Sequence, residues 1–280
     1  QAVNRPQPVE VEYKGVEILR ARGITRFNVD LMYGLPYQTV RGMQRNIDYC
    51  MLLKPDRLAV FGYAHVPWMK KHMTLINEGA LPDADLRYDL METARSELIS
   101  AGYVPLGIDH FAKADDDLTC ARDAGRLRRN FQGYTADDAD TLIGFGVSSI
   151  GRMPGGYIQN FADQPRYRDA VLDGALPISR GYALTRDDVI RARVVEQIMC
   201  YLRVDLQAVA AEFGVDGGYF AASIARAQAD LPPPLMTVTG SVLTLDPDAY
   251  MLARLMARAF DAYHKEAAEG AAVPRHARAV

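Results

Sequence analysis

Apolar residues recur along the first half of this chain with two periods, one typical of helices and one typical of strands. From Val9 to Ala21 apolar and charged residues have helical spacing, and Gly23 then supplies a stop signal. Short apolar runs at 27–33 and 58–63 indicate strands, and Thr39 is a candidate cap for the helix between them. The pattern predicts helices at 9–21, 39–53, 83–100 and 115–124, and strands at 27–33, 58–63, 103–108 and 142–150.

The alternation of strands with helices predicts an α/β fold. Strands joined through helices pair in parallel with right-handed crossovers, so residues 1–155 are expected to form a partial (β/α) barrel or an open sheet. Four strands are too few to close a barrel. Ligands of such folds gather at the C-terminal ends of the strands. The candidate site is therefore made of the segments that follow the predicted strands, 33–39, 64–67, 109–112 and 148–151.

The pattern changes beyond about residue 155, and residues 156–280 are expected to form a connector and a smaller, mainly helical domain. A helix is predicted at 187–202 with Thr185 as its cap, two short helices within 214–229, and a last helix at 248–263. Residues 236–245 have the alternation of a hairpin around Gly240 and Ser241. This order resembles a winged helix, but it has no basic recognition face for DNA. The Ala-rich basic tail from Glu266 is expected to be frayed.

The composition is ordinary for a globular protein, with 49% hydrophobic and 24% charged residues. A formal net charge of −3 gives no general attraction to nucleic acid or to an anionic membrane. No apolar run approaches the ~20 residues needed to cross a bilayer, and the first residues have no signal-peptide pattern. We therefore expect a cytoplasmic protein. The chain begins with Gln1 and not with Met, which fits a fragment of a longer protein.

The three cysteines do not form a metal-binding pattern. Cys50, Cys120 and Cys200 lie far apart in apolar or helical contexts, which indicates buried packing in a reducing compartment. The sequence also has no His/Cys/carboxylate spacing suited to zinc, no Gly-x-Ser-x-Gly elbow and no phosphate-binding glycine loop. We expect no metal ligands in this chain.

Four motifs identify a resemblance to a known family. They are Tyr-Gly-Leu-Pro-Tyr-Gln-Thr at 33–39, Phe-Gly-Tyr-Ala-His-Val-Pro at 61–67, Gly-Ile-Asp-His-Phe-Ala at 107–112 and Arg-Asn-Phe-Gln-Gly-Tyr-Thr at 129–135. With them the chain resembles oxygen-independent coproporphyrinogen III oxidase, a radical S-adenosylmethionine (SAM) enzyme of haem synthesis. The resemblance runs from residue 1 to about residue 265. It implies that residues 1–155 are the C-terminal portion of a radical-SAM barrel.

The resemblance implies a reaction and its cofactors. In this family a reduced [4Fe-4S] cluster cleaves SAM, and the enzyme decarboxylates two propionates of coproporphyrinogen III to give protoporphyrinogen IX. The family binds two SAM molecules and needs an electron donor or acceptor, whose identity the sequence does not give. Three closely spaced cysteines hold the cluster, and they are absent here. We therefore interpret the chain as the monomeric C-terminal part of such an enzyme, inactive alone, with the cluster ligands elsewhere in the complete protein.

The resemblance also implies four SAM contacts. Alternation places Asn28, Asp30 and Met32 on one face of a strand, and a buried carboxylate there must meet a cation or hydrogen-bond donors. A structural ion pair would satisfy Asp30 equally well. Arg5 is alternatively a surface residue, and Ala64 and Ile150 are alternatively barrel packing. Residues that match SAM contacts of the family are Arg5, Asp30, Ala64 and Ile150.

A basic cluster precedes the last motif and is the candidate substrate site. Coproporphyrinogen carries four propionates, and guanidinium groups are the preferred partners of carboxylates. The alternative is a solvated charged face that caps the preceding helix, and a lone histidine is commonly structural. Phe131 and Tyr134 are candidates for the walls of a flat tetrapyrrole. The candidate substrate residues are His110, Arg126, Arg128, Arg129, Gln132 and Tyr134.

Two other functions remain open from the sequence. A haem-binding chaperone related to this family shares the Tyr-Gly-Leu-Pro element, but generally lacks the motifs at 107–112 and 129–135. A degenerate barrel that kept its pocket and lost its cluster is the second alternative. The presence of both later motifs favours the oxidase.

Overall fold

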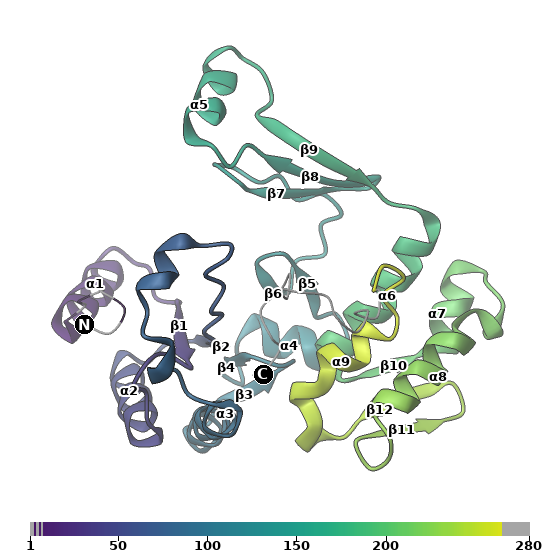
Figure 1. Cartoon of the computed structure of the whole chain (residues 1–280), viewed down its shortest axis with the longest axis horizontal. Helices are drawn as coiled ribbons and strands as arrows, with labels where there is room; N and C mark the ends of the chain where they lie inside the picture. The colour runs from purple at the N-terminus through teal and green to yellow at the C-terminus, as the bar shows by residue number, and fades with distance from the viewer. Residues whose placement is uncertain (1–2, 4–5, 7, 265–280) are drawn as a thin grey trace. The chain divides into compact units, whose positions relative to one another are not determined.

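The chain forms two compact units. The computed structural model describes residues 3, 6 and 8–264, and Figure 1 shows their helices and strands. Unit 1 ends at Ala124, and unit 2 runs from Gly125 to His264. The domain boundary that the sequence pattern places after residue 155 remains a prediction. No helix of the described residues has the length and apolar character that a membrane crossing requires.

Unit 1 contains a four-stranded mixed sheet of order β1-β2-β4-β3, open at both edges within the described residues. Strands β1 and β2 pair in parallel, as predicted, but β4 is antiparallel to both β2 and β3. The apolar run 103–108 was expected to be one strand, and this is wrong. Gly107 adopts a positive φ of 57° that turns the chain back, so the run yields two short strands of a hairpin. The elements are α1 (Val9–Ala21), β1 (Asn28–Tyr33), α2 (Val40–Leu53), β2 (Arg57–Gly62), α3 (Ala84–Ser100), β3 (Val104–Leu106), β4 (His110–Ala112) and α4 (Asp117–Asp123).

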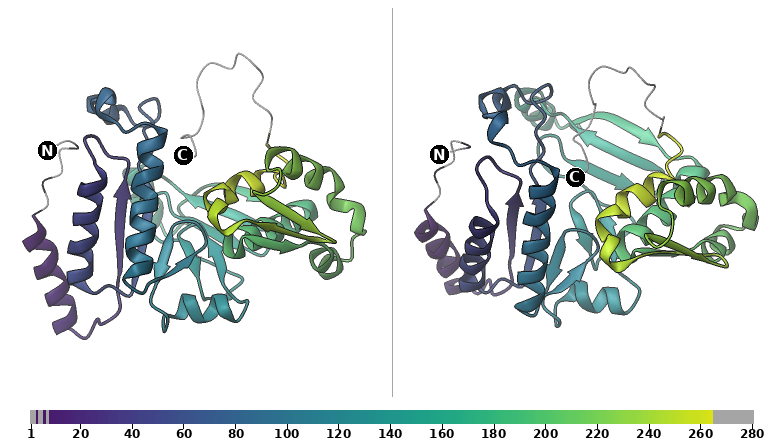
Figure 2. Two further views of the ribbon diagram at one scale, coloured as in Figure 1. Left: turned by 90° about the horizontal axis from the view of Figure 1, so that it is seen from below. Right: turned by 60° about the horizontal axis from the view of Figure 1, so that its bottom comes forward.

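Helices α2 and α3 pack against each other and supply much of the core of unit 1 (Figure 2). Met43 and Ile47 of α2 and Leu90 and Leu98 of α3 are buried. Burial of each such side chain contributes roughly 1.5–3 kcal/mol to folding. Thr39 caps α2 by accepting a hydrogen bond from the Gly42 amide, which confirms the predicted start of this helix.

Unit 2 combines two three-stranded antiparallel sheets, β7-β8-β9 and β10-β12-β11, with a short hairpin β5-β6 and helices α5 to α9 (Figure 1). The predicted helix at 187–202 and the hairpin at 236–245 are confirmed as α6 and as β11 with β12. The predicted last helix is shorter, because a 3₁₀ turn at Pro247–Leu252 precedes α9. The elements are β5 (Arg128–Asn130), β6 (Gly133–Thr135), β7 (Ile150–Met153), β8 (Gly156–Asn160), α5 (Gln164–Leu172), β9 (Ile178–Ala183), α6 (Arg186–Tyr201), β10 (Arg203–Asp205), α7 (Leu206–Phe213), α8 (Ala221–Asp230), β11 (Met236–Thr239), β12 (Val242–Leu245) and α9 (Ala253–Arg258).

The strand predicted at 142–150 is wrong. Leu142 forms only an isolated bridge with Arg152, and Ile150 is the first residue of β7. The carbonyl oxygens of Gly144 and Gly146 accept hydrogen bonds from the Asn160 side chain, both at 3.0 Å. These carbonyls therefore bond to the side-chain amide of the last residue of β8 and not to the backbone of a strand.

Helix α6 begins with a capping box. The Thr185 hydroxyl accepts from the Asp188 amide at 3.2 Å, and the Asp188 carboxylate accepts from the Thr185 amide at 2.8 Å. These two bonds satisfy backbone donors that the first turn of a helix leaves open. The predicted cap at Thr185 is confirmed.

Replacing Thr185 by alanine is expected to lower the free energy of unfolding by about 1 kcal/mol, the usual effect of removing an N-cap side chain. Urea unfolding followed by circular dichroism measures the change. Thr185→Ser keeps the hydroxyl and is the matched control, expected to stay within about 0.5 kcal/mol of wild type. Equal stability of all three proteins would show that the capping box contributes nothing.

Candidate functional sites in the two units

One face of the unit 1 sheet carries two of the candidate residues. The register pairs Asp30 of β1 with Ala59 of β2, and Ala59 with His110 of β4, so Asp30 and His110 lie on the same face. Asp30 is exposed, and its carboxylate accepts a hydrogen bond from the Asn28 amide at 2.6 Å. Asp30 was expected to be buried, and within the part of the chain that the structure describes this is wrong. The Asp109 carboxylate accepts a hydrogen bond from His110 Nδ1 at 2.7 Å.

Ala64 lies just beyond the end of β2 and is exposed. Its neighbour His65 is held on both ring nitrogens, by the Tyr63 hydroxyl at 3.1 Å and by the Glu78 carboxylate at 3.0 Å. Both nitrogens of His65 thus have structural partners. The predicted SAM contact at Ala64 remains a prediction, as does the one at Asp30. Arg5 lies outside the described residues.

Two motif glycines make room for an arginine at the ends of β1 and β2. Arg87 of α3 donates to the Tyr63 carbonyl oxygen at 3.1 Å, and its guanidinium lies over the Tyr33 ring at 5.6 Å. A Cβ atom at Gly34 would lie 2.4 Å from this guanidinium, and one at Gly62 would lie 2.7 Å from it. Gly34 also has a positive φ of 84°. A Cβ atom at either place would therefore force the Arg87 guanidinium to move, and at Gly34 the backbone conformation also favours glycine.

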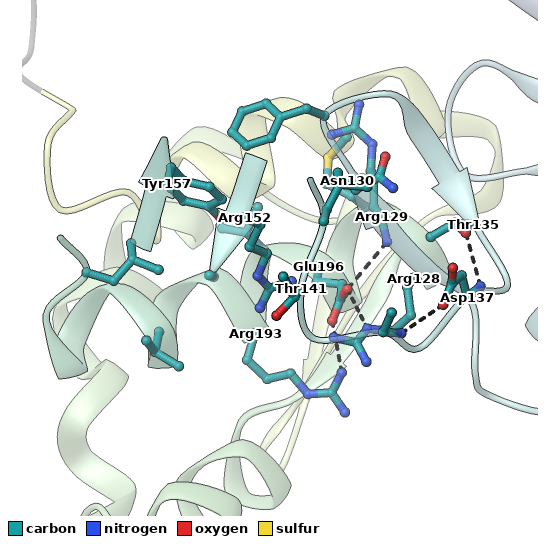
Figure 3. Close-up of a pocket in the computed structure, with 18 of the residues that line it drawn as sticks. Arg128, Arg129, Asn130, Thr135, Asp137, Thr141, Arg152, Tyr157, Arg193 and Glu196 are labelled. Carbon is teal, nitrogen blue, oxygen red and sulfur yellow. Dashed lines mark hydrogen bonds and ion pairs between the residues drawn. The ribbon is translucent and has the colours of Figure 1, made fainter. Parts of the chain in front are cut away.

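Unit 2 contains a cavity of about 580 Å³, which we call the arginine pocket. It is lined by β5 and the residues after it, by the ends of β7 and β8 that face it, and by α6 and the end of α7 (Figure 3). Its volume is in the range of small-molecule sites. Its charged and aromatic lining includes Arg128, Arg129, Phe131, Asp137, Arg152, Tyr157, Arg193, Glu196 and Glu212.

The structure divides the predicted substrate residues into three groups. Arg128 and Arg129 line the arginine pocket. Arg126 and Gln132 are exposed and are not lining residues, so no contact in the structure supports them. Tyr134 is buried, and its hydroxyl donates to the Met199 carbonyl oxygen at 2.9 Å, which anchors β6 to α6. All six assignments, including His110 of unit 1, remain predictions.

The pocket also contains residues that the sequence did not reveal. Arg152 belongs to β7, Tyr157 to β8, and Arg193 and Glu196 to α6. The only local signal is the spacing of Arg193 and Glu196, which are three residues apart and form an ion pair at 3.0 Å. Such a pair is ordinary on any helix surface. Only the fold brings these residues next to β5.

The cysteines do not fit an iron–sulfur cluster. Cys50, Cys120 and Cys200 lie on three different helices, α2, α4 and α6. Burial raises the pKa of Cys50 to about 11 and that of Cys200 to about 12, so neither thiol readily becomes the thiolate that ligates iron. Cys120 is exposed, which corrects the expectation that it is buried. Within the described part of the chain no cluster of three metal-ligating residues is present.

Ile150, the last predicted SAM contact, is the first residue of β7 and pairs with Gln159 of β8. Its side chain is half-buried. It lies in unit 2, whereas Asp30 and Ala64 lie in unit 1. The joint role of these three residues therefore remains a prediction.

Known proteins resemble this chain over nearly its whole length, although no protein-family model matches it. An oxygen-independent coproporphyrinogen III oxidase from Cereibacter sphaeroides is 42% identical over 262 residues, which are 94% of this chain and 58% of that protein. One from Bradyrhizobium diazoefficiens is 42% identical over 263 residues, with the same two shares. The solved structure of the coproporphyrinogen III oxidase from Escherichia coli, described as a radical SAM enzyme, matches with a TM-score of 0.88 and 33% identity.

That match covers 94% of this chain and 61% of the Escherichia coli protein. The chain thus spans about 58% of the length of its curated relatives. The resemblance predicted from the four motifs is confirmed: the chain is homologous to the oxygen-independent coproporphyrinogen III oxidases over part of their length.

Proposed function

We propose that this chain is the C-terminal part of an oxygen-independent coproporphyrinogen III oxidase. The similarity of 42% identity over 94% of the chain carries the proposal. The names of the relatives favour an oxidase over a haem chaperone. The complete enzyme converts two propionate side chains to vinyl groups, and each conversion loses carbon dioxide, one hydrogen atom and one electron. We place the reaction in the cytoplasm, with a monomeric enzyme and an electron partner of unknown identity.

The part of this chain in that reaction is to bind and orient. SAM and a [4Fe-4S] cluster supply the radical chemistry in this family, and the cysteines of this chain do not fit the cluster. We assign the cluster ligands to the part of the relatives' length that this chain does not span. Arg5, Asp30, Ala64 and Ile150 are proposed to contact SAM. Residues 1–155 are proposed to be part of the barrel. The helices and the hairpin that come after them are proposed to form a winged-helix-like domain.

The arginine pocket is proposed to bind the propionates of coproporphyrinogen III. Four of its lining residues are arginines, and two aromatic rings stand beside them, Phe131 and Tyr157, with centroids 5.0 Å apart and an edge-on geometry. Guanidinium groups bind carboxylates in a planar, two-point manner, and aromatic faces suit a ring-shaped ligand. A pocket that offers both fits a tetrapyrrole with several carboxylates.

The chain of residues 1–280 is expected to assemble no [4Fe-4S] cluster and to have no oxidase activity, because its three cysteines cannot converge on one cube. Anaerobic reconstitution followed by iron and sulfide analysis measures this. A stoichiometric cluster with the visible absorption of a [4Fe-4S] protein would contradict it. The matched experiment uses the complete protein, which should form protoporphyrinogen IX from coproporphyrinogen III. Haem transfer by the complete protein without that product would overturn the proposed function.

A further inference from the structure

Glu196 lies at the centre of the charged groups in the arginine pocket (Figure 3). One carboxylate oxygen accepts from Arg128 Nε at 2.9 Å and from the Arg129 backbone amide at 3.4 Å. The other accepts from Arg193 Nη1 at 3.0 Å. Its side chain is only 13% exposed, whereas the two arginine side chains are about one third exposed. Both oxygens of Glu196 are thus occupied by groups of this chain.

These contacts neutralise two of the four arginines. Arg193 has a second carboxylate partner, because its Nε donates to Glu212 at 3.2 Å. Burial alone would lower the pKa of Arg193, but Glu212 and Glu196 outweigh burial and raise it. Arg128 and Arg193 therefore have their charges compensated inside the protein, and each links α6 to a neighbouring element.

The other two arginines have no carboxylate partner among the residues that the structure describes. Arg129 lies over the Tyr134 ring at 5.5 Å, and its Nε is buried without a hydrogen-bond partner. Leaving a buried charged donor unpaired is unfavourable, so this guanidinium favours an anion. Arg152 makes backbone hydrogen bonds with Leu142, and its side chain lines the pocket. Asp137, the remaining acid of the lining, accepts from the Ala139 amide at 2.8 Å.

We propose that Glu196 is the internal counter-ion of the arginine pocket, which pairs with Arg128 and Arg193 and so leaves Arg129 and Arg152 as the carboxylate-binding groups. The proposal rests on the function proposed above and assigns its recognition residues. It separates the predicted basic cluster into Arg129, which binds ligand, and Arg128, which holds the fold. It adds Arg152 as a recognition residue and makes Glu196 the residue that sets how many carboxylates the pocket accepts.

Two probes test this with the chain of residues 1–280. Coproporphyrin III, the stable oxidised form of the proposed substrate, reports tetrapyrrole binding by its fluorescence. Benzene-1,2,4,5-tetracarboxylate reports the arginines without a tetrapyrrole and is measured by calorimetry. Arg129→Leu and Arg152→Leu are each expected to lower the affinity for both probes about 10- to 100-fold, since each removes a charged hydrogen bond. Glu196→Gln is expected to tighten the binding of both probes about tenfold, because it releases Arg128 and leaves Arg193 with Glu212 as its one carboxylate partner.

The controls separate recognition from folding. Arg128→Leu is expected to lower the melting temperature of the chain and to lower the affinity for the probes less than threefold. Glu196→Asp keeps the negative charge and should not increase the affinity for either probe. Arg168→Leu removes an exposed arginine of α5 outside the pocket and should change neither readout.

Each outcome decides a separate point. Equal loss of affinity in Arg128→Leu and Arg152→Leu, or weaker binding in a folded Glu196→Gln variant, would overturn the inference. If Glu196→Gln does not fold, the comparison of Arg152→Leu with Arg128→Leu decides alone. In another outcome, the variants change the affinity for benzene-1,2,4,5-tetracarboxylate as expected while no protein binds coproporphyrin III. That result would support the inference and refute the proposed substrate. Absence of binding of both probes to wild type and to Glu196→Gln would refute the inference.

Discussion

Replacement of Asp116 by alanine is expected to destabilise unit 1 by about 2–4 kcal/mol, the combined effect of losing charged hydrogen bonds and a helix cap. The Asp116 side chain is 3% exposed, and its two oxygens accept from Arg57 Nε at 2.9 and 2.8 Å. The same carboxylate caps α4 by accepting from the Leu118 amide at 2.8 Å. The substitution removes the cap and leaves Arg57 of β2 without this partner.

Trp68, the single tryptophan of the chain, lies in unit 1 and gives a fluorescence signal for its unfolding in urea. Asp117→Asn is the matched control, because Asp117 is the next residue and its ion pair with Arg26 is more than half exposed on both sides. That variant should lose less than about 1 kcal/mol, as exposed pairs do. Similar losses in Asp116→Ala and Asp117→Asn would show that burial of the Arg57 pair is not the cause. Asp116→Asn should fall between them, because it keeps an N-cap oxygen.

Elements with local signals could be predicted from the sequence. Thr39 and Thr185 stand immediately before amphipathic runs, and each caps its helix in the structure. The parallel pair β1 and β2 follows from two apolar runs joined by a helix. In these cases the residues that determine the element lie within it or next to it.

Three elements were predicted wrongly or missed, and only the first of these errors depends on a residue outside the segment. Residues 142–150 have the composition of a strand, but Asn160 binds their backbone and only the fold brings it there. Helix α7 was missed although Asp205 caps it and Gly214 ends it, because the run between them is short. Strand β4 was not predicted, because Gly107 turns the chain back within an apolar run that was expected to be one strand.

The same distinction applies to the arginine pocket. Its first half, Arg128 and Arg129, could be found because two arginines stand beside an aromatic motif. The contribution of β7 and α6 to the pocket could not be found, because Arg152 and Glu196 have no unusual neighbours in sequence. Glu196 also changes the meaning of the first half, since it pairs with Arg128 and not with the side chain of Arg129. Counting arginines in the sequence therefore overstates the number available to a ligand.

Asp30 is a proposed SAM contact in the complete protein of which this chain is proposed to be a part. Asp30→Ala is expected to slow SAM cleavage by one to three decades, because losing a charged hydrogen-bond partner at a binding site costs about 2–4 kcal/mol. Arg5→Ala is expected to act in the same direction. Iron and sulfide content should be unchanged in both, since neither residue is a cluster ligand in the proposal.

Stability measurements distinguish a structural role of Asp30 from a role in binding SAM. Asp30 is exposed on the sheet face that it shares with Ala59 and His110, and the Asn28 amide is the side-chain donor that contacts it. Asp30→Ala should therefore change the urea stability of the chain by less than about 0.5 kcal/mol, as surface substitutions do. Asn28→Ala removes that donor, keeps the carboxylate and is the matched control. Normal SAM cleavage by Asp30→Ala would refute the SAM assignment, and a large loss of stability would instead identify Asp30 as a structural residue of β1.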